Sequence, residues 1–435
     1  MKTNSVKSSI LSTIRVNVDG QLADVAKRPF DGANITAVEK QFIETVGQSG
    51  ASGLRQLLSC NDENQKAISF GGKKHYRKYF STGRYLTLLG EIALKRGVYQ
   101  SNISERSICP LELKLKFIND YVSFAAAEYI CYNMSSMTLG EFVKHCKKWT
   151  FMKPSENTVK KVLEYVGHFL ETTDFFDTIN SVETASTDAV TLAMSLDSTS
   201  VNIRQQGWKH ATAATITTYE ISGERINTSY VGRMPEAGKR KAKQLLEKEV
   251  QTKVEQHNFK NIVCIADGAR DLWLYFQKKY PNAIHVLDFF HASEHLANLS
   301  GLLFDDKSEA KAWYQKYRKI LKNDPKGAAK VIRASRYRKD LIEKNHEINS
   351  EIKYLQHNRK RMNYFNLRQQ KLPIGSGIVE AACKNLIGAR MKRSGMRWSI
   401  DGGQTILTLR SILLSGRWEN FWTYFVQHHF PELQT

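Results

Sequence analysis

Cysteine is scarce and scattered in this chain. Only six of the 435 residues are cysteine, no two of them form a CxxC pair, and their spacing is not that of a disulfide-stapled secreted domain. They are Cys60, Cys109, Cys131, Cys146, Cys264 and Cys383. This distribution argues against a secreted disulfide framework and fits a reducing cytoplasm.

Long apolar runs are also missing. No hydrophobic stretch approaches the roughly 20 residues that span a bilayer, and no apolar signal-peptide core follows Met1. We therefore expect no membrane segment. Hydrophobic residues still make up 41% of the chain, so a core can form, and the length predicts two to four structural units.

Negative charge is in short supply. The chain has 64 Lys and Arg against 43 Asp and Glu, a balance that suits a polyanionic partner, nucleic acid before a membrane surface, although many soluble proteins are basic. Residues 310–371 alone hold 18 Lys and Arg against 5 Asp and Glu. Such runs usually mark a solvated helical face, but interleaved aromatics such as Trp313 and Tyr317 favour a surface that follows phosphates.

The first 180 residues divide into three predicted parts. Residues 1–74 form an N-terminal helical segment, with an amphipathic helix over 35–59. Residues 75–110 alternate apolar and polar side chains around Gly83 and Gly90, which predicts a small β unit. Residues 111–180 have a helical pattern that includes a helix, a short turn and a second helix.

The helix-turn-helix pattern favours a DNA reader. Pro154 breaks the chain, Ser155 is the expected N-cap, and the second helix carries Val159 and Val162 on its apolar side. In such a motif the first turns of the second helix enter the major groove. The residues predicted to contact DNA there are Ser155, Asn157, Lys160 and Lys161. A plain helical hairpin is the alternative.

After a polar linker at residues 181–188, the order of elements predicts a mixed α/β sheet. Three strand-like runs, a basic helix, an apolar strand, a helix and a final strand follow one another. They span residues 191–204, 208–221, 224–234, 238–257, 261–268, 269–280 and 283–290. A catalytic domain would cover 189–304 and 373–425, interrupted by a basic helical insertion at 305–372.

Three carboxylates stand where apolar structure ends. Asp197 ends the apolar run TLAMSLD of the first predicted strand, Asp267 ends the run IVCIAD of the fourth, and Glu380 follows a Gly-Ser-Gly turn at the start of a helix. If the first and fourth strands are neighbours, the two aspartates lie side by side, and Glu380 could face them. The alternative is that the aspartates are ordinary strand ends and Glu380 is an exposed helical acid.

Clustered carboxylates raise one another's pKa unless a cation offsets their repulsion. Hard oxygen ligands favour Mg²⁺ or Mn²⁺. Two such ions, roughly 4 Å apart, can clamp the attacking and leaving oxygens of a phosphodiester displacement. The three acids therefore predict a two-ion site.

Three segments carry a family resemblance: IADGARDLW (265–273), VLDFFHASEHL (286–296) and GSGIVEAACKNLIGARMKRSGMRWS (375–399). In them the chain resembles the DDE transposases of bacterial insertion sequences, on the Mutator-like branch of the ribonuclease H-like superfamily. The resemblance covers roughly residues 75–425. It implies a ribonuclease H-like fold, metal binding at Asp197, Asp267 and Glu380, and cleavage and transfer of DNA strands. It also implies a homo-oligomer in the bacterial cytoplasm, associated with the nucleoid.

The resemblance further implies roles for Asp288 and His291. Mutator-like transposases have an acid or cysteine, two residues and a histidine after the second carboxylate, and Asp288-Phe289-Phe290-His291 matches that spacing. His291 would lie beside the active site and contact the scissile phosphate or the DNA strand. Asp288 would orient it or support the metals indirectly. The alternative is that both residues cap the helix that begins here.

A basic and aromatic strip follows Glu380 and is expected to grip phosphates and stack on a base. It consists of Lys384, Arg390, Lys392, Arg393, Arg397 and Trp398. A basic helix surface is the alternative reading. The last apolar segments, within residues 402–425, predict a helix pair that packs on the core or on a second protomer.

Two departures from the family pattern limit what can be carried over. Asp197 is followed by Ser198 instead of glycine, which alters only the turn, and a lone Cys109 stands where relatives have cysteine pairs, so no zinc is expected there.

Two other functions stay open, a metal-dependent nuclease or resolvase, and a transposase-derived DNA-binding protein without catalysis. No nucleophile motif of a tyrosine or serine recombinase is found.

Overall fold

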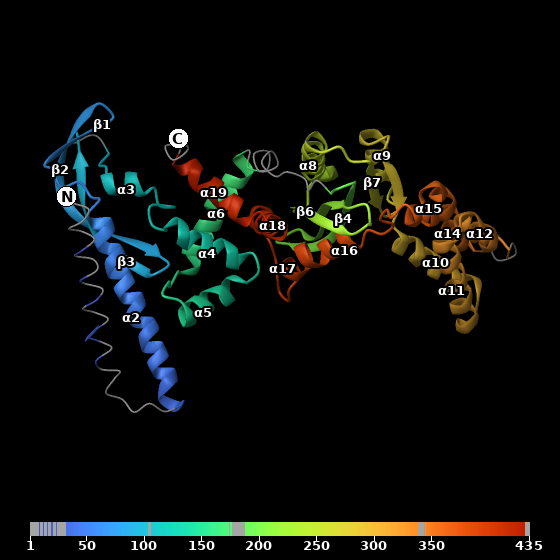
Figure 1. The fold of residues 1–435 in the computed structure, drawn as a ribbon, viewed down its shortest axis with the longest axis horizontal. Coiled ribbons are helices and arrows are strands. Elements are labelled where there is room, and N and C mark those ends of the chain that lie inside the picture. The colour runs from blue at the N-terminus through green and yellow to red at the C-terminus, as the bar shows by residue number, and fades with distance from the viewer. Residues whose placement is uncertain are drawn as a thin grey trace. The chain divides into compact units, whose positions relative to one another are not determined.

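The chain folds into two compact units, Met1–Phe169 with Trp422–Thr435, and Leu170–Phe421, in a computed structural model. The structure describes residues 32–102, 106–173, 188–337 and 345–430, together with the single residues 8, 12, 15, 19, 20, 23, 175 and 343. The linker predicted at 181–188 lies outside this part of the chain, apart from Asp188. Figure 1 labels the helices and strands.

The first unit contains a small antiparallel sheet preceded by a helix. Helix α2 (Gly32–Ser59) confirms the predicted amphipathic helix, and β1 (Ala67–Phe70), β2 (Lys73–Thr87) and β3 (Gly90–Gln100) pair in the order β1-β2-β3. The β unit therefore begins earlier than the predicted residue 75. Gly83 lies inside β2, opposite Leu94, and marks no turn. The turn falls just before Gly90, whose φ of +101° disfavours any side chain.

The helical part of this unit has the predicted helix, turn and helix. Its elements are α3 (Pro110–Leu115), α4 (Phe124–Met134), α5 (Leu139–Trp149) and α6 (Glu156–Thr172). Ser155 caps α6, because its Oγ accepts a hydrogen bond from the Thr158 amide at 3.1 Å. Val159 and Val162 are buried on the opposite side of that helix, as predicted. Residues 422–429 of α19 (Trp418–His429) bring the Phe425 ring against Phe124 and Phe169.

The second unit is built on a five-stranded mixed sheet in the order β6-β5-β4-β7-β8. Figure 1 labels β4, β6 and β7 of this sheet. The strands are β4 (Thr191–Ile203), β5 (Gly207–Tyr219), β6 (Arg225–Arg233), β7 (Asn261–Ala266) and β8 (Ile284–Leu287). β5 pairs antiparallel with β4 and β6, whereas β4, β7 and β8 are parallel. The predicted mixed sheet and its element order are confirmed. β4 runs past Asp197 to Ile203, within one residue of its predicted end, because β5 continues to pair with it.

Helices cover both faces of this sheet. The 3₁₀ turn η1 (Ala237–Lys239) leads into α8 (Arg240–Gln256), which joins β6 to β7, and α9 (Arg270–Lys279) joins β7 to β8. Val231 lies in one core cluster with Leu246 and Val250 of α8. A Cβ on the next residue, Gly232, would instead meet side chains of a second set of helices. Since successive residues of a strand face opposite sides, the two sets of helices lie on opposite faces.

This second set of helices comes from the end of the chain. α16 (Gly377–Ala382), the π-helix η3 (Cys383–Gly388) and α17 (Ala389–Met391) follow one another without a break, and α18 (Ile400–Leu414) packs beside β6. A π-helix leaves carbonyl groups without their usual α-helical partners. The buried Arg410 of α18 satisfies two of them, since its guanidinium donates to Leu386 O at 2.8 Å and to Asn385 O. The predicted apolar C-terminal helix thus packs on the core.

The basic insertion is helical, as predicted. After α10 (Phe289–Leu303) it contains α11 (Lys307–Asn323), α12 (Gly327–Ser335), α14 (His346–His357), the 3₁₀ turn η2 (Arg359–Arg361) and α15 (Tyr364–Gln369). Tyr364 anchors it to the sheet, because its buried hydroxyl donates to Leu287 O at the end of β8 at 2.9 Å. Among the described residues, no helix is long and apolar enough to cross a membrane. All six cysteines are free thiols.

Candidate active site

Asp197 and Asp267 occupy matching positions on neighbouring strands. The last parallel pair of β4 and β7 is Ser195 with Ile265, and each aspartate lies two residues further along its chain. Neighbouring strands are about 4.8 Å apart. The first and fourth strands are neighbours, which was the condition for the two aspartates to lie side by side, and both aspartates follow the same end of the parallel pairing.

Glu380 shares a hollow with Asp197. This hollow has a volume of about 570 Å³, and its lining includes Asp197, Thr199, Glu380, Cys383, Lys384 and Lys392. The Cys383 thiol donates to Asp197 Oδ2 at 3.5 Å. Burial raises the pKa of Cys383, and the carboxylates of Asp197 and Glu380 raise it further, so the thiol stays protonated and remains a donor.

The helix that follows the Gly-Ser-Gly turn explains this arrangement. The Glu380 amide bonds to Ser376 O at 3.0 Å, so Glu380 stands in the first turn of α16. Residues three and four positions on share its face of a helix. Cys383 accordingly lies towards Asp197, while the Lys384 ammonium pairs with Glu380 Oε1 at 2.7 Å. Both partners of this ion pair are exposed, so it contributes little stability.

Asp267 is held by the turn between β7 and α9. Its Oδ1 accepts a hydrogen bond from the Ala269 amide at 3.0 Å. The Tyr354 ring of α14 covers Gly268, and a Cβ at that position would overlap the ring. Burial and the nearby carboxylates of Asp267 and Asp288 raise the pKa of Tyr354 well above its usual value. A helix of the insertion therefore forms part of the wall beside Asp267.

The three acids do not form a ready-made metal cluster. Within the described part of the chain, no three His, Cys, Asp or Glu side chains are close enough together to hold a metal ion. Asp197 and Glu380 line one hollow, and Asp267 is aligned with Asp197 in the sheet. Carboxylates without a cation repel one another, and Glu380 is turned to Lys384 instead. The donors present are hard oxygens, the type that Mg²⁺ and Mn²⁺ prefer.

Asp288 is a buried capping residue, only 1% exposed. Its Oδ1 accepts from the His291 amide at 2.8 Å at the start of α10, and its other oxygen accepts from the Ser376 amide just before α16. The capping alternative therefore applies to Asp288. By these two bonds Asp288 links the end of β8 to the turn that presents Glu380, so its action on a substrate can only be indirect.

The side chain of His291 caps nothing. Its Nδ1 lies 3.2 Å from Glu294 Oε2, and the ring is 40% exposed. One turn further on, His295 Nδ1 lies 2.6 Å from Glu351 Oε2, and the His295 ring stacks on Tyr354 with centroids 3.5 Å apart. His291 is thus partly open to solvent, whereas His295 ties α10 to α14.

One residue of the predicted basic strip is misassigned. Arg390 is 2% exposed, and its guanidinium lies over the Trp398 ring, 4.8 Å from the centroid. A buried guanidinium cannot grip a DNA phosphate, so Arg390 is structural. Trp398 is half-buried and donates from Nε1 to Met391 O at 3.1 Å. The other basic residues of the strip, Lys384, Lys392, Arg393 and Arg397, are exposed.

The four residues predicted to read DNA are exposed on α6. Ser155 also caps the helix, whereas Asn157, Lys160 and Lys161 project from its first turns. Their contact with DNA stays a prediction. Sequence reasoning missed Cys383 and Tyr354. The first could have been found from its position three residues after Glu380, but nothing in the sequence connects Tyr354 with Gly268.

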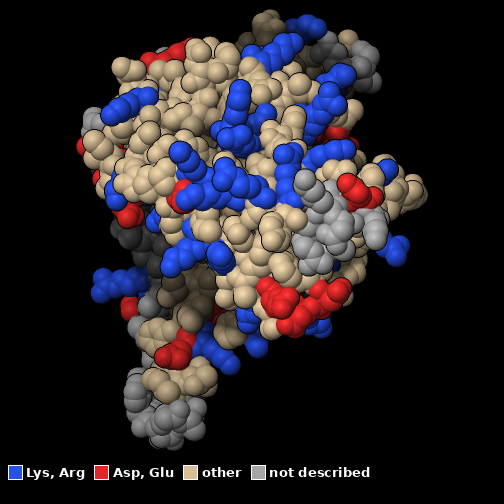
Figure 2. All heavy atoms as spheres, turned by 90° about the vertical axis from the view of Figure 1, so that its right-hand side faces the viewer, with Lys and Arg blue, Asp and Glu red and all other residues tan. Residues whose placement is uncertain are grey.

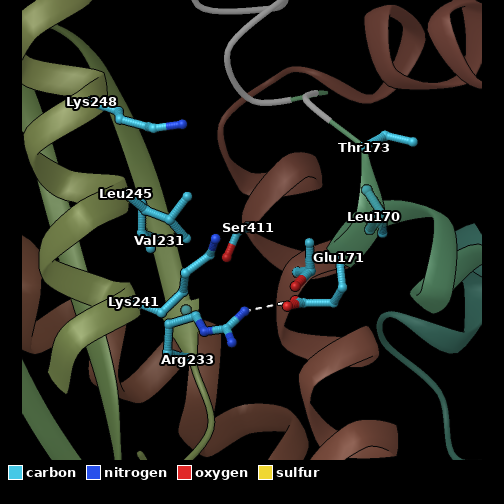
Figure 3. A pocket seen from close by; sticks show the side chains of 11 residues that line it. Leu170, Glu171, Thr173, Val231, Arg233, Lys241, Leu245, Lys248 and Ser411 are labelled. Carbon is cyan, nitrogen blue, oxygen red and sulfur yellow. Dashed lines mark hydrogen bonds and ion pairs between the residues drawn. The ribbon is translucent and has the colours of Figure 1, made fainter.

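A second hollow, of about 70 Å³, contains none of the predicted site residues. Figure 3 shows it between Glu171, Arg233 and the lysines of α8. Arg233 Nη1 and Glu171 Oε1 face each other there at 2.7 Å. Because this ion pair neutralises its own charges, the hollow is a poorer candidate for chemistry than the carboxylate hollow.

Comparisons with known proteins add one distant likeness. Neither a known protein family nor a curated protein matches this sequence. Among solved structures, the Drosophila P element transposase strand transfer complex is similar at a TM-score of 0.27 and 8% identity, over 71% of this chain and 81% of that chain. Likeness at this level does not establish a shared fold. The function is therefore inferred from the residues and strands of this chain.

Proposed function

We propose that this protein is a DNA transposase of ribonuclease H-like fold, which binds element ends and cleaves and joins DNA strands. The observation that carries the proposal is the register of β4 and β7, which aligns Asp197 with Asp267 at the centre of the sheet. Three antiparallel strands followed by two parallel ones, with the first strand central, is the order expected of a ribonuclease H-like sheet. The transposase-like motifs around all three acids support the same assignment.

Asp197, Asp267 and Glu380 would hold two Mg²⁺ or Mn²⁺ ions. Bound there, these ions would activate the attacking oxygen and stabilise the departing one in phosphodiester displacement. The chain's own residues orient the acids. Cys383 donates to Asp197, the turn to Ala269 fixes Asp267, and Asp288 fixes the turn before Glu380.

The remaining site residues would bind the DNA. The exposed Lys384, Lys392, Arg393 and Arg397 would neutralise phosphates beside the acids. Since Asp288 anchors both His291 and the turn before α16, we place His291 near the cleaved strand. Helix α6 would enter the major groove of the element end. We further propose that two or more copies act together in the bacterial cytoplasm, at the nucleoid, each holding double-stranded DNA.

A nicking assay tests this function. The full chain is incubated with supercoiled plasmid and Mg²⁺ or Mn²⁺, and Asp267→Asn is compared with Asp271→Asn, an exposed acid in the first turn of α9. Asp267→Asn should abolish nicking and spare DNA binding, while Asp271→Asn should retain both. If Asp267→Asn nicks as well as the unmodified chain, the proposal is wrong.

The same assay separates the other two functions. A nuclease or resolvase would nick DNA but would not join a cut end to a second duplex, so strand joining distinguishes it from a transposase. A non-catalytic DNA-binding protein would bind DNA without nicking it, and Asp267→Asn would change nothing.

A further inference from the structure

An open, aromatic hollow lies within the basic insertion. It is bounded by the end of α10 and by α11 and α12, and its volume of about 650 Å³ falls in the roughly 300–1,000 Å³ range of pockets that hold organic ligands. Its lining includes Phe304, Trp313, Tyr317, Ile320, Arg333 and Tyr337. None of these residues belongs to the carboxylate site.

The rings of this hollow form a cluster around Trp313. Trp313 and Tyr317 are one helical turn apart on α11, with centroids 4.6 Å apart and ring planes tilted by 43°, and the Phe304 centroid lies 6.2 Å from that of Trp313. All three rings are half-buried. Tyr337 is 87% exposed, more than any other large hydrophobic side chain of the described residues. Apolar surface left open in this way indicates a ligand site.

The surroundings of the hollow are strongly basic. Arg333 is exposed in its lining, and the Lys316 ammonium lies 5.5 Å from the centre of the Tyr317 ring. Lys330 also lines the hollow, where Asp324 neutralises it. Figure 2, which faces the insertion, shows Lys and Arg side chains spread over much of this end of the unit. The charge thus complements a polyanion that enters the hollow with an aromatic or apolar group.

We propose that this hollow binds an unpaired nucleobase of a DNA strand, stacked on Trp313 and packed against Tyr317, with Arg333 and Lys316 on the flanking phosphates. A paired duplex keeps its base faces stacked inside, so none of its bases can stack on these rings. A displaced or single-stranded base offers a π-face to the rings and negative charge to the basic residues. The inference rests on the proposed function, since strand cleavage and joining expose such bases.

Fluorescence and binding titrations of the full chain test the inference. The probes are a duplex with one bulged 2-aminopurine and the same duplex fully paired, both without divalent ions so that cleavage cannot contribute. The variants are Tyr337→Ala, whose exposed ring makes it safe for folding, Trp313→Ala, and the conservative Trp313→Phe. Tyr76→Ala, an exposed tyrosine of β2 beside Lys74, is the matched control.

Trp313→Ala should weaken binding of the bulged probe by about 5- to 150-fold, the range of one base–aromatic stack, and should relieve quenching of the 2-aminopurine. Trp313→Phe and Tyr76→Ala should bind it nearly as well as the unmodified chain, and Tyr337→Ala should be intermediate. No variant should change binding of the paired duplex.

Equal losses on both probes, or no loss on the bulged one, would overturn the inference. So would a change of oligomeric state in Tyr337→Ala on gel filtration, because the hollow would then hold a second copy of the chain. Failure here leaves the Asp267→Asn nicking result untouched, so the two proposals fail separately.

Discussion

The ring of Tyr354 lies against Gly268, in the space where any other residue would carry its Cβ. Gly268 follows Asp267 directly, and Tyr354 comes from α14, 86 positions later in the chain. The His295 ring stacks on the Tyr354 ring, and the Glu351 carboxylate holds His295 in place. The insertion is thus packed against the turn that carries one of the three proposed catalytic acids.

Gly268→Ala should therefore displace Asp267. The half-buried Tyr354 ring is held by its stacking on His295, so the turn must shift, and we expect at least about a tenfold loss of nicking, the equivalent of about 1.4 kcal/mol. Gly301→Ala is the control, since a Cβ there meets nothing within 4 Å.

A double-mutant cycle identifies the cause of this loss. In a Tyr354→Ala background the ring is gone, so adding Gly268→Ala should cost little more. Independent, additive losses would show that the contact between the two residues is not what positions Asp267.

Lys161→Ala should weaken DNA binding through one lost phosphate contact. In that case the slope of log affinity against log salt should become shallower by about 0.9. Lys40→Ala, an exposed lysine of α2, should leave the slope unchanged. If both variants change the slope equally, α6 does not contact DNA in preference to α2, and the hairpin that contains α6 is only structural.

Arg417 and Glu249 form a buried pair whose loss should be costly. Arg417 Nη2 lies 2.6 Å from Glu249 Oε1, and the side chains are 3% and 4% exposed. Arg417→Met leaves the buried carboxylate with Lys253, 3.4 Å away, as its remaining ion partner, so we expect a loss of up to about 3–5 kcal/mol in the free energy of unfolding. The double variant Arg417→Met with Glu249→Leu should recover part of it. Chemical denaturation of all three proteins measures these differences.

The same pair predicts an acid-sensitive stability. Burial acts to raise the pKa of Glu249, but Arg417 and then Lys253 outweigh it, and the pKa is lowered. A carboxyl whose pKa is lower in the folded state contributes its full stability above the unfolded value of about 4.3 and loses it as pH falls through the folded value. The unmodified chain should therefore lose stability below that pH more steeply than the double variant, as measured by melting temperature.

The sheet and the site were predictable to different degrees. The strands and helices around Asp197 and Asp267 follow from local alternation and periodicity. The adjacency of β4 and β7 does not, because β5, β6 and α8 separate them in the chain. Arg390 was misassigned because a cation–π contact with Trp398 buries it. The Tyr354–Gly268 contact joins residues too distant in sequence for any local pattern.

Titration of Mn²⁺ by electron paramagnetic resonance tests the central claim most directly, because it measures whether Asp197, Asp267 and Glu380 share bound ions. Asp197→Asn, Asp267→Asn and Glu380→Gln should each weaken Mn²⁺ binding by at least about tenfold, as loss of one charged oxygen ligand requires. Asp271→Asn should bind Mn²⁺ like the unmodified chain. Equal Mn²⁺ binding by all five proteins would contradict a metal site formed by these three acids.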